Sequence, residues 1–111
     1  MDTQHRVAAF VETHELEAPP EFRILDLVSE VGEVAKAAAD STGYGTTPDS
    51  LAVPSDEIGD VVFALLALAE SLDVDAETAL DEALEKYERR IERRDTPSSG
   101  PGESDGRPDR R

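Results

Sequence analysis

Apolar residues recur at helical spacing through most of the chain, and proline and glycine separate the resulting segments. The spacing i, i+3, i+4, i+7 predicts amphipathic helices. They are expected over residues 2–15 and 21–41, from Ser55 or Asp56 onward, and in a last segment that ends near Arg94. A loop that contains several glycines and prolines is expected before the third helix. The predicted fold is all-α, a bundle of four main helices.

Two of these helices carry the strongest apolar signal. The third contains the uninterrupted apolar run 61–69, which predicts burial on most sides, at the centre of the bundle, in a subunit interface, or both. The second is expected to bury one face. That face consists of Ile24, Leu25, Leu27, Val28, Val31, Val34, Ala35 and Ala38.

The domain organisation follows from a change in composition near the end of the chain. Residues 1–95 are expected to form one helical domain, as the length of 111 residues suggests. Residues 96–111 lack apolar periodicity and are rich in Pro, Gly and Ser. This segment is predicted to be a disordered C-terminal tail.

The chain is strongly acidic, with a formal net charge of −15. Such a charge argues against binding duplex nucleic acid through a basic face. Abundant acids with few lysines resemble the surfaces of proteins from salt-loving organisms; the alternative is an acidic face for a basic partner. The absence of cysteine excludes disulfides and thiolate metal sites. With no apolar run of membrane-spanning length and no signal-like N-terminus, a cytoplasmic location is predicted.

Two short acidic motifs lie on consecutive predicted helices, Glu30-x-x-Glu33 and Glu57-x-x-Asp60. Residues three apart lie on the same side of a helix, so each motif presents a pair of carboxylates. Facing pairs of carboxylates repel one another unless a cation lies between them. Oxygen ligands suit magnesium, with manganese as the alternative. Ordinary solvated surface acids are the competing interpretation.

The second motif favours a functional role. Asp60 leads directly into the apolar run, where a carboxylate is partly desolvated and needs a partner. Gly32 and Gly59 lie inside the motifs, and close helix packing is the expected compensation for their low helix propensity. A ferritin-like di-iron site is disfavoured because neither His5 nor His14 follows a glutamate by three residues.

Basic residues gather at the end of the fourth predicted helix. Lys86 and Arg90 lie four apart on one face and are the best candidates to contact a polyphosphate. The alternative is that they form surface pairs with neighbouring glutamates, or stabilise the negative end of the helix. The spacing alone leaves both interpretations open.

At these residues the chain resembles the MazG-like nucleotide pyrophosphohydrolases of the all-α NTP pyrophosphatase superfamily. The family pattern is E-E-x-x-E on one helix, E-x-x-D on the next, an apolar helix, and a later K-F-E-R-R stretch. The corresponding segments here are SEVGE at 29–33, DEIGDVVF at 56–63 and KYERR at 86–90. The resemblance covers roughly residues 3–94. Phosphoribosyl-ATP pyrophosphohydrolases share the helices and acids, but their usual Tyr-His after the second motif is absent here.

The resemblance implies hydrolysis of a nucleoside triphosphate to a monophosphate and pyrophosphate. It implies that one or more Mg²⁺ ions activate the attacking water while bound by Glu30, Glu33, Glu57 and Asp60. One of the glutamates would act as general base.

The resemblance also implies that Lys86 and Arg90 stabilise charge on the phosphates, and that the protein is a homodimer or homotetramer. The alternative is a non-catalytic acidic helical protein that binds nucleotide or a partner. Ser29, which stands where the family often has the first glutamate, and Leu84, which stands where it often has asparagine, support that alternative.

Overall fold

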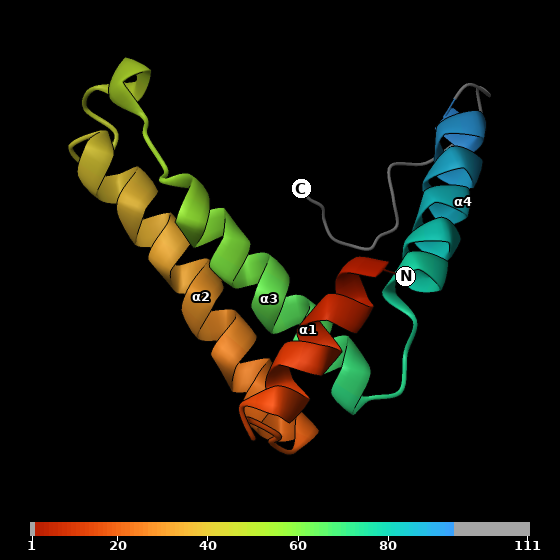
Figure 1. The fold of residues 1–111 in the computed structure, drawn as a ribbon. Helices are drawn as coiled ribbons and strands as arrows, with labels where there is room; N and C mark the ends of the chain where they lie inside the picture. The colour runs from red at the N-terminus through yellow and green to blue at the C-terminus, as the bar shows by residue number, and fades with distance from the viewer. Residues whose placement is uncertain (1, 95–111) are drawn as a thin grey trace. The chain divides into compact units, whose positions relative to one another are not determined.

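The computed structural model describes residues 2–94, which form four α-helices and one short 3-10 helix (Figure 1). These elements are α1 (Asp2–Thr13), α2 (Pro20–Ser41), η1 (Pro48–Ser50), α3 (Ser55–Ser71) and α4 (Ala76–Arg94). The described part of the chain contains no strand, so the all-α prediction is confirmed. The tail predicted at 96–111 lies outside the described residues.

Proline sets two of the helix starts. Pro20 occupies the first turn of α2, where its missing N–H has no helical partner to lose. Pro54 directly precedes α3, so the predicted start at Ser55 is confirmed. The first helix ends earlier than predicted, at Thr13, and Glu15 then adopts a left-handed backbone with φ of 55°. The chain turns there towards α2.

The chain divides into two compact units, and the first contains α1, α2 and α3. Within it, α3 packs against both α1 and α2. The rings of Phe10 on α1 and Phe63 on α3 meet edge to face, with centroids 5.9 Å apart. The buried apolar residues of the described chain all lie on α3: Ala64, Leu66, Ala67 and Ala69. The apolar third helix is therefore the centre of this unit.

A buried glutamine fastens the start of α1 to the end of α3. Gln4 is only 3% exposed. Its Nε2 donates to Glu70 Oε2 and to the carbonyl of Val74, both at 2.8 Å, and its Oε1 accepts from the amide of Ala76 at 2.8 Å. Every polar group of the side chain is thus paired, as a buried amide requires. These bonds fix one wall of the cavity described below.

The second unit begins at Glu77, and its described part is the rest of α4. Asp75 immediately precedes this helix. Along α4, apolar residues follow one another at alternating spacings of four and three: Leu80, Leu84, Tyr87 and Ile91. None of the described helices combines the length and hydropathy that a membrane span needs.

Only part of the face that α2 was predicted to bury is covered within this chain. Ile24, Leu25, Val28 and Val31 are 47%, 68%, 64% and 50% exposed. The reason is that α3 packs against α2 at one edge of this face, where Leu27, Val34 and Ala38 are partly covered together with the neighbouring Ala37. We call Ile24, Leu25, Val28 and Val31 the apolar face of α2.

Candidate metal and nucleotide site

Three acidic side chains converge where α2 and α3 lie side by side (Figure 1). Glu30 comes from the middle of α2, and Glu57 and Asp60 from the first turns of α3. One carboxylate oxygen from each lies within 4.8 Å of the other two. We call these three residues the acidic triad. The structure therefore brings together three of the four carboxylates that the sequence singled out.

Small side chains allow the two helices to carry these acids inward. On α2 the side of Glu30 continues to Ala37, and on α3 the side of Asp60 continues to Ala64. Ala64 is 1% exposed, and Ala37 is partly buried. Because alanine needs little space, the helices approach each other while the longer carboxylates meet at one end of their contact.

The electrostatic surroundings raise the pKa of two members of the triad. For Glu30 the main cause is partial desolvation, followed by the negative charge of Asp60 and of neighbouring acids. For Glu57 desolvation is again first, followed by the charges of Asp56, Asp60 and Glu33. Both causes disfavour the ionised carboxylates. A cation between them would remove this repulsion.

The donor set suits a hard divalent cation. All three groups offer carboxylate oxygens, and two oxygens bound to one Mg²⁺ at about 2.1 Å lie at most about 4.2 Å apart. Adjacent oxygens of an octahedral Mg²⁺ lie about 3.0 Å apart, so carboxylate oxygens that lie within 4.8 Å of one another would have to move closer together to bind one ion. Asp60 is exposed, and Glu30 and Glu57 are partly so, which leaves the outer side open to water and a substrate. The residues therefore fit magnesium or manganese.

Glu33 lies beside the triad and outside its closest group. Its charge contributes to the raised pKa of both Glu30 and Glu57. It also acts on Lys36, whose Nζ lies 3.2 Å from Asp40 Oδ2. The hydrogen bond and charge of Asp40 are the main causes of the raised pKa of Lys36, with Glu33 next.

Lys36 is a cation near the acidic site that the sequence argument missed. It is exposed and follows Glu33 by three residues on α2, so helical spacing from the first motif could have identified it. Lysine presents a compact charge on a flexible stem. Lys36 can therefore turn towards an anion near Glu33 at the loss of only an exposed ion pair.

Lys86 and Arg90 belong to α4, in the second unit. Both lie beside the ring of Tyr87, with Lys86 Nζ 5.4 Å and Arg90 Cζ 6.0 Å from the ring centroid. These contacts gather two positive charges on one side of α4. Their role in binding phosphate stays a prediction.

The close packing expected at the two motif glycines is absent in the described chain. A Cβ added at Gly32 or at Gly59 would meet no atom within 4 Å. Both residues are exposed. The helices therefore meet beside the glycines, and these positions face open space in the single chain.

Comparison with known proteins identifies the family of this chain. The family model of the MazG nucleotide pyrophosphohydrolase domain matches residues 19–94. The chain belongs to this MazG family. The matched region begins just before α2 and ends with α4, so it includes the acidic triad, Glu33, Lys86 and Arg90.

A protein of Bacillus subtilis gives two further comparisons. The protein YpjD of strain 168, described as uncharacterized, is 37% identical over 68 residues; the match covers 58% of this chain and 60% of YpjD. The crystal structure of YpjD, described as that of a candidate pyrophosphatase, superposes with a TM-score of 0.62 at 32% identity. That superposition covers 78% of this chain and 88% of the other.

Proposed function

We propose that the protein hydrolyses nucleoside triphosphates, ribo- or deoxyribo-, to the monophosphate and pyrophosphate with the help of Mg²⁺. The observation that carries this proposal is the convergence of Glu30, Glu57 and Asp60 in a chain of the MazG family. Mn²⁺ is the alternative cation, because it accepts the same oxygen ligands. Glu33, next to the triad, would complete the set of carboxylates.

The reaction replaces the anhydride linkage between the α- and β-phosphates with the elements of water. The oxygen of water joins one product, and a proton must be accepted. Bound metal supplies charge neutralisation and lowers the pKa of water. Glu30 and Glu57 have raised pKa values, which suits a carboxylate that accepts a proton. We assign general-base catalysis to one of these two glutamates.

Cations of the protein would bind the phosphates that the carboxylates repel. We assign this role to Lys86 and Arg90, whose positive charges gather beside Tyr87. Lys36 is an additional candidate because it lies close enough to Glu33 for their charges to interact. If Lys86 contributes binding equally before and in the transition state, Lys86→Ala will raise KM more than it lowers kcat.

We further propose that the protein works as a homodimer or homotetramer. No helix of the first unit covers the apolar face of α2. On α3, Ile58, Val62 and Leu65 are also exposed, at 49%, 42% and 47%. Several large apolar side chains left exposed on neighbouring helices favour a protein interface.

A non-catalytic binding protein of the same fold is the second candidate function. It is favoured by Ser29, which provides no carboxylate where the family pattern often has its first glutamate. Such a protein would bind nucleotide and Mg²⁺ at the same residues without releasing pyrophosphate.

Measurement of pyrophosphate release distinguishes the two functions. The full chain is incubated with each of the common ribo- and deoxyribonucleoside triphosphates, with Mg²⁺ and with EDTA, at low and high salt. Metal-dependent release from at least one of them is the expected result. Nucleotide binding with Mg²⁺ but without release from any of them would contradict the hydrolase and support the binding protein.

A further inference from the structure

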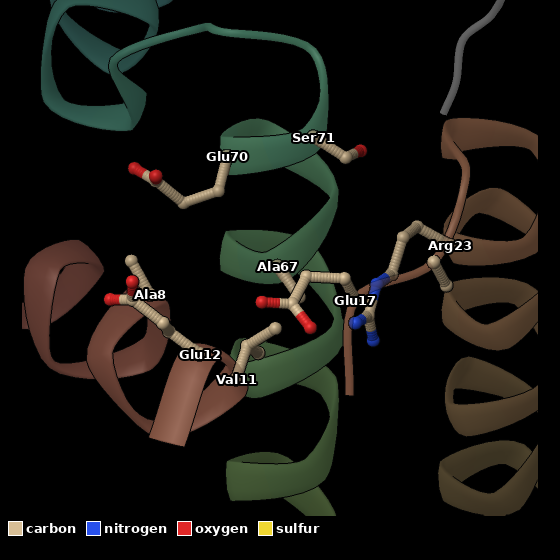
Figure 2. Close-up of a pocket in the computed structure, with 9 residues that line it drawn as sticks. Ala8, Val11, Glu12, Glu17, Arg23, Ala67, Glu70 and Ser71 are labelled. Carbon is tan, nitrogen blue, oxygen red and sulfur yellow. The ribbon is translucent and has the colours of Figure 1, made fainter. Parts of the chain in front are cut away.

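A separate cavity lies between the end of α1, the segment that leads into α2, and the last turns of α3 (Figure 2). Its volume is about 210 Å³. It is lined by Ala8, Val11, Glu12, Glu17, Ala18, Arg23, Ala67, Glu70 and Ser71. None of these residues belongs to the acidic triad. Arg23 precedes Glu30 by seven residues, about 10 Å along α2.

Arg23 is the buried cation of this cavity. The residue is 6% exposed, and Figure 2 shows its guanidinium directed into the cavity. It donates one hydrogen bond, to the carbonyl of Leu16. Within residues 2–94, no carboxylate forms an ion pair with it. A guanidinium has five N–H donors, so a buried one with a single neutral acceptor is incompletely paired.

The position of Arg23 in α2 makes its incomplete pairing more unfavourable. It lies in the first turn of α2, where the positive end of the helix dipole repels a cation and attracts an anion. A carboxylate next to the guanidinium would interact favourably with both. Planar carboxylates also match the fork of N–H groups that arginine presents.

Three carboxylates also line this cavity, those of Glu12, Glu17 and Glu70, and all three residues are exposed. We call these three residues the rim glutamates. The carboxylate of Glu70 is held in place by Gln4, at 2.8 Å. Short apolar side chains line the cavity as well, those of Ala8, Val11, Ala18 and Ala67. The lining therefore combines one buried positive charge with three negative charges on exposed residues.

We propose that this cavity binds a small α-amino acid with a basic side chain. Its carboxylate would pair with Arg23, and its ammonium groups would lie among the rim glutamates. A ligand with one negative and two positive charges complements a lining with one positive and three negative charges. The volume of about 210 Å³ is below the range of about 300–1,000 Å³ typical of drug-sized ligands, so the ligand must be small.

The same charges argue against a nucleotide or inorganic phosphate here. A multiply charged anion would gain one guanidinium and face three carboxylates. A simple diamine would satisfy the rim but leave Arg23 incompletely paired. The internal alternative is an ion pair between Arg23 and Glu17, whose carboxylate faces the guanidinium in Figure 2. That pair would exclude the ligand.

Titration calorimetry of the full chain with three matched compounds tests the proposal. L-lysine carries the carboxylate and both ammonium groups, cadaverine is the same molecule without the carboxylate, and acetate provides the carboxylate alone. We expect L-lysine to bind at least tenfold more tightly than either fragment. Equal binding of L-lysine and cadaverine, or no binding of L-lysine, would overturn the proposal.

Variants of the lining assign the binding to this cavity. Arg23→Gln should abolish the preference for L-lysine over cadaverine, and Glu17→Gln should weaken L-lysine several-fold. Glu21→Gln is the matched control, because Glu21 is exposed, lies two residues from Arg23 and does not line the cavity. If Arg23→Gln does not fold, Glu17→Gln decides. Unchanged L-lysine affinity in Glu17→Gln, or equal weakening in the control, would contradict binding at this site.

Discussion

Two sides of α2 differ in composition and in what covers them. The side of Glu30 lies against α3, so a carboxylate is partly desolvated next to two others. The apolar face, which includes Val28 and Val31, is exposed. A typical surface helix of a globular protein has the opposite arrangement, with its apolar residues facing the core and its charged residues facing the solvent. Within this chain alone, the carboxylates on one side of α2 therefore lack a counter-charge, and the apolar residues on the other side lack a covering surface.

The contrast indicates two different kinds of missing partner. Converging carboxylates are relieved by a cation, which pairs with all of them at once. An exposed apolar face is relieved by another apolar surface, because burial removes its contact with water. Metal binding and self-association should thus be separable. Substitutions of the carboxylates should affect metal binding without affecting self-association, and substitutions in the exposed apolar surface should have the opposite effect.

The largest effect is expected from Glu57→Gln on the acidic side. The amide keeps the size of the side chain but removes a charge beside the proposed metal. Pyrophosphate release with Mg²⁺ should fall at least about a hundredfold, the range expected for losing one acid–base or electrostatic contribution. Steady-state kinetics of the purified variant give this value, and circular dichroism verifies that the helices remain.

Glu82→Gln is the matched control, because it changes an exposed glutamate outside the triad. It should release pyrophosphate at the rate of the unmodified protein. Activity retained in Glu57→Gln would exclude the acidic triad as the reaction site. The mass of the assembly should be the same in both variants.

The second effect concerns assembly and the opposite side of α2. Val28→Asp places a charge within the apolar face, where it could be buried in an interface only at a large desolvation penalty. The mass in solution, measured by light scattering after size exclusion, should fall to that of the single chain. Ala9→Asp, an equally charged change at an exposed position of α1, should leave it unchanged. A monomeric unmodified protein would disprove the proposed oligomer.

A third, smaller effect is the pH dependence of stability without metal. Folding raises the pKa of Glu30 and Glu57 above the ordinary 4.5. Between the ordinary and the raised pKa the folded state holds more protons than the unfolded state, so its free energy of unfolding falls as pH rises through this window. Thermal melts in EDTA across this window should show the fall, and Glu57→Gln should reduce it.

Bound metal should reverse the pH dependence of stability, so that the free energy of unfolding rises with pH. Mg²⁺ binds the ionised carboxylates of the folded state, so the unfolding temperature at neutral pH should rise with Mg²⁺ concentration. The increase should disappear in Asp60→Ala. An unfolding temperature of the unmodified protein that does not respond to Mg²⁺ or Mn²⁺ would contradict the metal site.

The sequence predicted the acidic side of α2 better than it predicted which side of α2 is covered. The positions of the helices followed from local signals, such as Pro54 before α3 and the apolar run that makes α3 central. The acids of the two motifs followed from helical spacing, and three of them converge. Periodicity did not reveal which side of α2 meets α3, because it identifies apolar residues without identifying what covers them. The Arg23 cavity was missed because it joins residues 8–23 to residues 67–71, which are distant in sequence.

The smallest expected effect is on the motif glycines, which lie next to the acidic triad. Gly32→Ala adds a Cβ that would meet no atom of the described chain within 4 Å, and Gly59→Ala does the same on α3. Alanine favours a helix by about 1 kcal/mol over glycine, so each variant should raise the free energy of unfolding by up to that amount. Chemical denaturation in EDTA measures the change. Full activity and unchanged mass would show that nothing approaches these positions. If a variant is more stable but loses pyrophosphate release, the space beside the glycine is occupied by substrate; if it loses assembly, that space is occupied by the second copy.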